Sequence, residues 1–268
     1  MDHRQGVRSR MRQSVRTVWT LLAGCVGVFA LLAGAAEAAE IKVLSAGAVK
    51  AVVPELADAF QRESGHTVQI TFDTVGALRK KAATEPADVL ILTDAAIDDL
   101  AGQGIAVAGT RADIARVGIG VAVKQGAPLP DISTPDALKH TLLSVKSLVY
   151  VDPARGATSG IHFASVLQRL GIADAVKDKT LLWPGGFAAE AVAKGQAELC
   201  VHQISEILPV AGVTLVGPLP KDLQKVTTYS AGLAARSAAP DAGRAFLVFL
   251  ARPAFKAKFA AAGLDYKE

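Results

Sequence analysis

The sequence predicts an α/β protein in two lobes, each a mixed, mostly parallel sheet flanked by helices. Short apolar runs of β-favouring residues alternate with helix-type patterns along almost the whole chain after residue 39. Residues 39–268 suit two domains of ordinary size. A turn-rich passage follows Lys124, and a strand around Tyr229 leads back. We therefore expect lobe 1 to comprise residues 39–123 and 229–268, and lobe 2 to comprise residues 124–228.

The individual elements follow from local pattern. Ile41, Val43 and Leu44 form an apolar run that suits a buried parallel strand. The next apolar residues have helical spacing and stop at Gly65, and Thr134 followed by Pro135 marks another helix start. The expected strands are 41–44, 68–72, 89–92, 116–124, 148–151, 180–183, 199–202, 214–216 and 226–235, and the main expected helices are 49–63, 95–100, 134–144, 161–170, 188–194, 240–250 and 253–261.

Residues 1–38 have the features of a secretory signal peptide. Five arginines precede an apolar run from Val18 to Ala36, and Ala36-Glu37-Ala38 is a small-residue cleavage site. The length of the run leaves an uncleaved membrane anchor as an alternative. The segment ending at Cys25 resembles a lipobox, so lipidation of Cys25 is a second alternative. We expect cleavage and export to the periplasm.

Charge and composition exclude several classes of function. Five arginines and two acidic residues lie in residues 1–38, so 24 of the 29 basic and 23 of the 25 acidic residues remain after cleavage. This near-neutral balance does not support nucleic-acid binding. Cys200 is then the single cysteine, which rules out an intrachain disulfide and suits a buried thiol. Phosphate-loop, nucleophile-elbow and zinc motifs are missing, so we expect neither cofactor nor metal.

Small and hydroxyl-bearing residues follow strand after strand, each time just before a helix. Backbone N–H groups at such helix starts attract anions, and the carboxyl ends of the strands in an open α/β sheet face one ligand site. The pattern predicts a small anion held between the lobes, while simple helix capping is the alternative reading of each loop. The candidate ligand-binding residues are Ser45, Ala46, Gly47, Ala48, Thr74, Val75, Thr158, Ser159, Gly186, Gln203 and Ser205.

Three residues in or beside these loops could carry charge or move protons. Arg155 is the strong cation among the loops, and its guanidinium suits a carboxylate. His202 and Glu206 are the candidate bases. The alternative readings are a solvated arginine, a packed histidine and an acidic residue in the first turn of a helix.

Several segments together resemble the type II periplasmic solute-binding proteins, in particular the branch that includes molybdate-binding proteins. The resemblance spans nearly all of residues 39–268 and rests on the residues 45–48, Thr74, 86–91, 158–161 and 195–199. It implies a clamshell fold, an ABC permease as partner and a monomeric state. In that branch neutral hydroxyl and N–H groups hold the oxyanion. By resemblance, the corresponding positions here are Ser45 or its neighbours, Thr74 and the loop at Gln203. Thr74 replaces a serine, no tyrosine occurs at 203–205, and Arg155 is extra, so a small organic carboxylate is an equal alternative.

The chain also resembles periplasmic aconitate isomerases, which share this scaffold. Residues 121–128, 130–133, 203–206 and 228–232 carry that likeness. The resemblance implies an enzyme that interconverts cis- and trans-aconitate by moving a proton between two carbons. Arg155 would then hold a carboxylate, and His202 or Glu206 would be the base.

Overall fold

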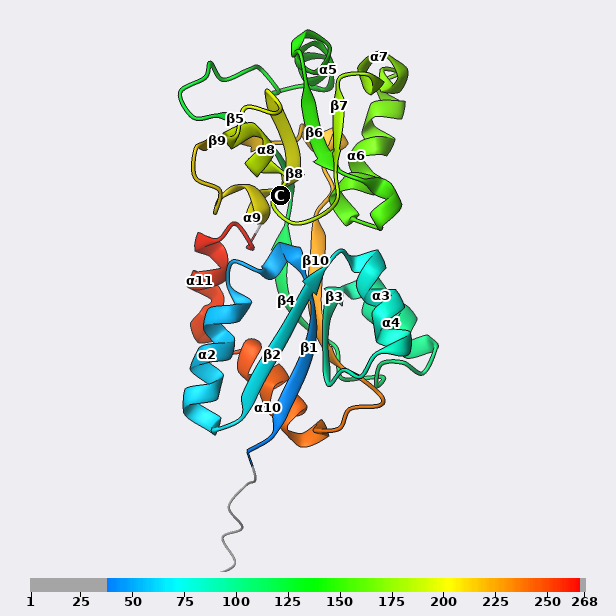
Figure 1. Ribbon diagram of the computed structural model, residues 1–268, viewed down its shortest axis with the longest axis vertical. Helices are drawn as coiled ribbons and strands as arrows, with labels where there is room; N and C mark the ends of the chain where they lie inside the picture. The colour runs from blue at the N-terminus through cyan, green and yellow to red at the C-terminus, as the bar shows by residue number, and fades with distance from the viewer. Residues whose placement is uncertain (1–37, 266–268) are drawn as a thin grey trace, which may run out of the picture. The chain divides into compact units, whose positions relative to one another are not determined.

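Two five-stranded sheets organise the residues that the computed structural model describes, 38–265 (Figure 1). The predicted signal peptide and the Cys25 alternative lie outside these residues. The first sheet has the order β2-β1-β3-β10-β4 and the second the order β7-β6-β8-β5-β9. The first sheet contains β1 (Glu40–Ala46), β2 (Thr67–Asp73), β3 (Val89–Thr93), β4 (Ala112–Val117) and β10 (Thr227–Leu233). The second contains β5 (Ile119–Lys124), β6 (Leu148–Val151), β7 (Thr180–Trp183), β8 (Leu199–Gln203) and β9 (Val213–Pro218).

The two sheets share one pairing pattern. Three strands of each sheet run parallel, and a fourth strand, β10 or β5, is inserted antiparallel to both of its neighbours. Each inserted strand enters directly from the other sheet, since β5 follows β4 and β10 follows β9. The predicted fold class, two lobes with mixed and mostly parallel sheets, is confirmed.

The strand expected at 116–124 is two strands that belong to different sheets. β4 ends at Val117, β5 begins at Ile119, and the chain changes sheet at Gly118. The crossing predicted at Lys124 is therefore corrected to Gly118, because continuous apolar character cannot reveal that a strand changes partners at a glycine. We propose that lobe 2 begins at Gly118 and that the first lobe resumes with β10 at Thr227.

Helices cover both faces of each sheet. Around the first sheet, α2 and α10 contact each other on one face, and α3 and α4 do so on the other (Figure 1). Around the second, α6 packs on β6 and β8 beside α5 and α7, and α8 and α9 pack on β5. The helices are α2 (Val53–Ser64), α3 (Val75–Thr84), α4 (Asp94–Gly102), α5 (Pro135–Ser144), α6 (Thr158–Arg169), α7 (Ala173–Lys177), α8 (Ala189–Ala193), α9 (Ile204–Ile207), α10 (Pro240–Leu250) and α11 (Lys256–Ala261), with short 3₁₀ turns η1 (Gly47–Val49), η2 (Pro153–Arg155), η3 (Lys221–Leu223) and η4 (Pro253–Phe255).

The buried carboxylate of Asp88 ties the first sheet to its closing helix. Asp88 accepts hydrogen bonds from the backbone N–H of Lys42 at 2.8 Å, from Ser237 Oγ at 2.6 Å and from the N–H groups of Ala238 and Ala239. Burial by itself would raise the pKa of this carboxyl, but these hydrogen bonds outweigh it and hold the pKa below its ordinary value. The residue that precedes β3 thus fixes the chain just before α10.

Gln224 joins the two connections between the sheets. Its side chain accepts a hydrogen bond from Ile119 N at 2.8 Å and donates one to Ile119 O at 2.9 Å. Ile119 is the first residue of β5, and Gln224 lies just before β10. The two connections are therefore linked side by side where the chain passes from one sheet to the other.

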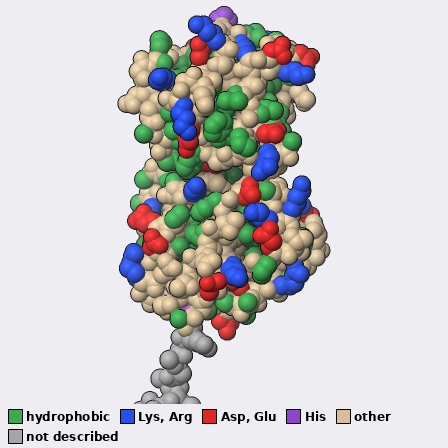
Figure 2. All heavy atoms as spheres, in the orientation of Figure 1, with side chains coloured by type: hydrophobic (Ala, Val, Ile, Leu, Met, Phe, Trp, Pro, Cys, Tyr) green, Lys and Arg blue, Asp and Glu red, His purple; other side chains and the backbone are tan. Residues whose placement is uncertain are grey.

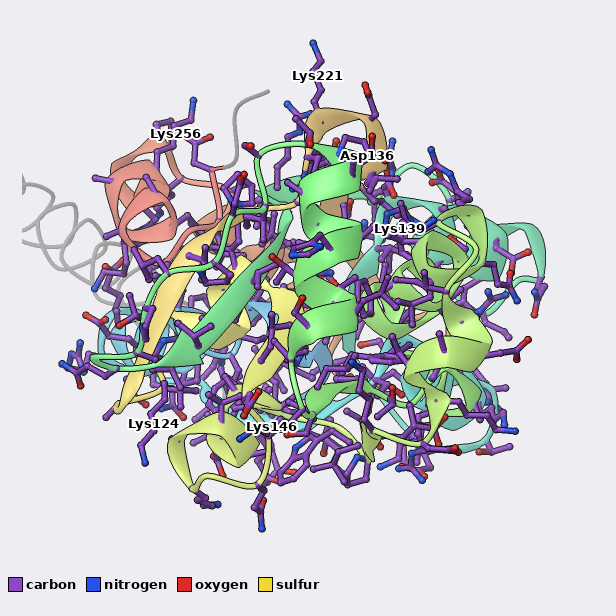
Figure 3. The ribbon with its side chains drawn as sticks, turned by 90° about the horizontal axis from the view of Figure 1, so that it is seen from above. Lys124, Asp136, Lys139, Lys146, Lys221 and Lys256 are labelled. Carbon is purple, nitrogen blue, oxygen red and sulfur yellow. The ribbon has the colours of Figure 1, made fainter. Side chains whose placement is uncertain are left out.

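The surface carries interspersed charges. Figure 2 shows acidic and basic side chains side by side on the visible face, an arrangement unlike the basic surface that binds nucleic acid. Lys124, Lys146 and Lys221 extend outward on the lobe of the second sheet (Figure 3). Within residues 38–265, no helix has the length and hydrophobicity needed to cross a membrane.

Candidate functional site

A cavity of about 120 Å³ lies where the carboxyl ends of strands from both sheets meet. Its volume suits a small ligand, because pockets for drug-sized molecules measure roughly 300–1,000 Å³. Its lining comprises Ala46, Gly47, Ala48, Lys50, Phe72, Asp73, Thr74, Val75, Val151, Ala157, Thr158, Ser159, Gly185, Gly186, Phe187, His202, Gln203, Glu206 and Tyr229.

The first sheet contributes the residues that follow β1 and β2. Ala46, Gly47 and Ala48 continue from β1 into the 3₁₀ turn η1. Thr74 is the N-cap of α3, and its Oγ1 accepts a hydrogen bond from Ala77 N at 3.3 Å. Thr74 is thus a helix cap and a lining residue at once, so the two readings of this loop do not exclude each other.

The second sheet contributes the start of α6. Ala157, Thr158 and Ser159 line the cavity, and the N-cap residue Ala157 has no side chain that could satisfy the first-turn N–H groups. Such unsatisfied N–H groups, together with the helix dipole, favour an anion at the start of a twelve-residue helix. The hydroxyls of Thr158 and Ser159 add neutral hydrogen-bonding groups.

Lys50 is the cation of the cavity, and sequence reasoning missed it. It follows η1, and its ammonium lies 5.7 Å from the ring centroid of Phe72 and 5.3 Å from that of Phe187. Phe72 belongs to β2, whereas Phe187 precedes α8 on the second sheet, so one ammonium contacts aromatic rings from both lobes. The expected helix over 49–63 hid this residue, because a 3₁₀ turn interrupts the chain between β1 and α2.

Both ring nitrogens of His202 are engaged in hydrogen bonds within the protein. The N–H of Gln203 lies 2.8 Å from Nδ1, and because a backbone N–H can only donate, Nδ1 is an acceptor. Nε2 therefore carries the hydrogen and donates it to Gly186 O at 2.9 Å. Ser159 Oγ is a second neighbour of Nδ1, at 3.2 Å. Both nitrogens have partners within the protein, so His202 positions its neighbours rather than offering a base to the cavity.

Glu206 brings a buried carboxyl to the cavity. Its Oε2 lies 3.6 Å from Nδ1 of His202, and a Cβ placed on Gly47 would lie only 2.8 Å from its Oε1. The glycine in the first loop therefore allows the carboxyl to come close. Burial raises the pKa of Glu206, and the charge of Lys50 only partly offsets this effect. A carboxyl with a raised pKa beside a ligand cavity can hold a proton and exchange it.

Gln203 and Tyr229 form a second buried polar pair. Gln203 Nε2 donates a hydrogen bond to the Tyr229 hydroxyl at 3.2 Å, and the Thr158 side chain also hydrogen-bonds to that hydroxyl. Burial, with Glu206 as a further cause, raises the pKa of Tyr229, so its phenol stays neutral. Gln203 Oε1 is buried and has no hydrogen-bond partner within the protein. Tyr229 was expected only as a point of return between the lobes.

Most of the predicted site residues meet at this cavity. Ala46, Gly47, Ala48, Thr74, Val75, Thr158, Ser159, Gly186, His202, Gln203 and Glu206 line it, and their binding roles remain predictions.

Three predicted residues lie elsewhere. Ser45 is fully buried within β1, where its hydroxyl contacts Ala46 O, and Ser205 is buried outside the cavity lining. Arg155 is exposed and outside the lining, and it contributes its backbone carbonyl rather than its guanidinium to the contact between the lobes. These residues lie in segments next to the cavity, but the sequence does not show the directions of their side chains.

A direct backbone contact joins the lobes beside the cavity. Gly76 N donates to Gly156 O at 3.0 Å, and Thr74 Oγ1 donates to Arg155 O at 2.5 Å. A Cβ built on Gly76 would lie 2.7 Å from Gly156 Cα, closer than real Cβ atoms approach. Glycine at 76 therefore lets the start of α3 touch the turn before α6.

Among residues 38–265, no group of three or more His, Cys, Asp or Glu side chains could hold a metal ion.

Comparisons with known proteins agree with this architecture. The chain is 35% identical over 218 residues to an aconitate isomerase from Pseudomonas sp, which covers 79% of this chain and 82% of that protein. It is 31% identical over 183 residues to the molybdate-binding protein ModA of Azotobacter vinelandii, covering 66% and 69%. The solved periplasmic molybdate-binding protein of that organism superposes with a TM-score of 0.72 at 21% identity, over 85% of this chain and all of the other. The family model for bacterial extracellular solute-binding proteins matches residues 41–265, and the chain belongs to this family.

Proposed function

We propose that this protein captures a small organic acid anion in the cavity between its lobes and delivers it to an ABC importer. The observation that carries the proposal is the joint lining of the cavity by both sheets, with Lys50 on one side and the hydroxyls and start of α6 on the other. A ligand gripped from both lobes stabilises the closed arrangement, which is how hinged binding proteins signal occupancy.

The charges in the cavity favour an organic acid over molybdate or sulfate. Besides Lys50, the lining holds two carboxyl groups, Asp73 and Glu206. Asp73 lies 3.7 Å from Lys81, and Glu206 is buried. A doubly charged oxyanion would meet both carboxyls, whereas an organic acid can direct one carboxylate to Lys50 and other atoms to the remaining walls.

A ligand screen tests the proposal. Residues 39–268 would be purified and titrated by calorimetry and thermal shift with acetate, lactate, succinate, malate, citrate, trans-aconitate, sulfate, molybdate and tungstate. Lys50→Met keeps the aliphatic stem and removes the charge. It should lower the affinity for any acid that the wild type binds by about tenfold or more. Lys124→Met removes an exposed lysine outside the cavity and should change nothing. Equal losses in both variants, or no binding of any anion in the panel, would refute capture.

The importer and the oligomeric state belong to the same proposal. We infer that a permease in the inner membrane receives the ligand from a monomeric binding protein. Sedimentation of residues 39–268 with and without ligand should give a single monomeric species. Deletion of the gene should abolish uptake of the bound acid at low external concentration, and normal uptake in the deletion strain would contradict the transport role.

A second candidate, isomerisation of aconitate, is supported by Glu206 and by the aconitate isomerase relative. The reaction removes a proton from the CH₂ carbon of trans-aconitate, shifts the double bond by one carbon and returns a proton at the far end of the three-carbon unit. A buried carboxyl whose pKa is raised above its ordinary value is a stronger base than a solvent-exposed one, which suits both the removal and the return of the proton. Because His202 has no free nitrogen, Glu206 is the remaining candidate base of the two.

Turnover separates the two functions. The protein would be incubated with trans-aconitate in D₂O, and the cis isomer and its deuterium content would be followed by proton NMR. An isomerase produces cis-aconitate, and Glu206→Gln should slow it by about a hundredfold or more. Binding of acids without any cis-aconitate removes the isomerase and leaves capture.

A further inference from the structure

Gln203 lines the cavity, and the hydrogen bonds of its side-chain amide bear on the identity of the ligand. Gln203 is 1% exposed, its Nε2 is committed to Tyr229, and its Oε1 has no partner among the protein atoms. A buried carbonyl oxygen left without a donor is unfavourable, and binding sites supply such partners from the ligand. The orphan oxygen thus points to a donor on the bound molecule.

The neighbouring groups cannot serve as that donor. The backbone N–H of Gln203 donates its hydrogen bond to Nδ1 of His202, and Nε2 of His202 donates to Gly186 O. Glu206 faces Lys50, His202, Tyr229 and Cys200, and none of these four forms a hydrogen bond with Gln203 Oε1. Gln203 Oε1 therefore obtains a hydrogen-bond donor only from an O–H or N–H group of a bound molecule.

We propose that the ligand is a hydroxy acid: one carboxylate is held near Lys50, and a hydroxyl group donates its hydrogen to Gln203 Oε1. This inference rests on the capture function and narrows its ligand class. A fully deprotonated oxyanion such as molybdate or sulfate offers only acceptors and leaves Gln203 Oε1 unpaired. A simple acid without a hydroxyl satisfies Lys50 but leaves the same oxygen unpaired.

Matched ligand pairs that differ by one hydroxyl test this directly in the wild-type protein. Glycolate would be compared with acetate, each enantiomer of lactate with propionate, and each enantiomer of malate with succinate, by calorimetry on residues 39–268. At least one hydroxy acid should bind about fivefold or more tightly than its partner. Equal affinities within every pair, or tightest binding of molybdate or sulfate, would overturn the inference while leaving anion capture intact. No binding of any acid would refute capture itself.

Gln203→Leu provides a second, independent measurement. Leucine removes the acceptor at similar size, so the variant should lose more affinity for the hydroxy acid than for the acid without the hydroxyl. Lys50→Met should weaken both members of a pair alike, because it removes the charge contact that they share. An equal loss for both members in Gln203→Leu would contradict the assigned role of Gln203 Oε1. If the variant does not fold, the wild-type pairs still decide.

Discussion

Replacing Gly76 by alanine should weaken ligand binding without destabilising the fold. The added Cβ would lie 2.7 Å from Gly156 Cα and 3.2 Å from Arg155 O, so the start of α3 must withdraw from the turn before α6. Withdrawal breaks the hydrogen bond from Gly76 N to Gly156 O, at 3.0 Å, and strains that from Thr74 to Arg155 O, at 2.5 Å. Two hydrogen bonds contribute about 1–3 kcal/mol together, which corresponds to a loss of about 5- to 150-fold in affinity.

The opposite sign of the stability change makes the test specific. Gly76 lies in the first turn of α3, where alanine is the better helix former by up to about 1 kcal/mol. The melting temperature without ligand should therefore stay level or rise by roughly 2–4 °C. Thermal unfolding and calorimetric titration with the acid that binds the wild type best would measure both quantities on the same sample.

Gly102→Ala is the matched control. Gly102 ends α4, and a Cβ placed there meets nothing within 4 Å. This variant should keep the wild-type affinity. The reasoning fails if Gly76→Ala binds as tightly as the wild type, because the contact between the lobes would then not contribute to the bound state. It also fails if Gly76→Ala lowers the melting temperature, because the added methyl group would then disturb the fold within one lobe.

Three further predictions concern stability and reactivity. Gly160→Ala should destabilise the fold by about 3 kcal/mol or more in urea unfolding, since its Cβ would lie 2.0 Å from Val151 O; a smaller loss means that α6 can shift. Asp88→Ala should cost about 3 kcal/mol at pH 7, and because its pKa is lowered in the folded state, the cost should shrink as the pH falls below the ordinary value of 3.8; a constant cost would contradict this. Burial raises the pKa of Cys200, so its thiol should react with a disulfide reagent only after unfolding, and rapid native labelling would show that it is accessible.

The sequence predicted the order of the elements well, because each apolar run that it identified forms a strand of one of the two sheets. For β3 and β6, a short apolar run, preceded by Pro86 or followed by Asp152, was enough to predict a strand. The predicted cap at Thr134 with Pro135 after it is also observed at the start of α5. These features are local, so neighbouring residues alone determine them.

What the sequence could not predict depends on contacts between distant segments. Gly118 separates two strands of different sheets, although the residues on both sides have the same apolar character. Lys50 lines the cavity and lies near Phe187, which is far away in the sequence, so local pattern could not reveal this contact. Arg155 was favoured for its charge, but the direction of its side chain depends on the turn at Gly156, whose φ is 71°. Charge and position in a loop identify candidates, and tertiary contacts select among them.

The exchange of strands between the sheets affects how this protein can be made. The first sheet lacks β10, the strand between β3 and β4, until residues 227–233 have been synthesised. When the first 117 residues have been synthesised, β3 and β4 are present but the strand that lies between them is not. The last strand of the second sheet, β9, is synthesised before β10. A central strand that is synthesised so late delays the native state of the first lobe until translation is almost finished.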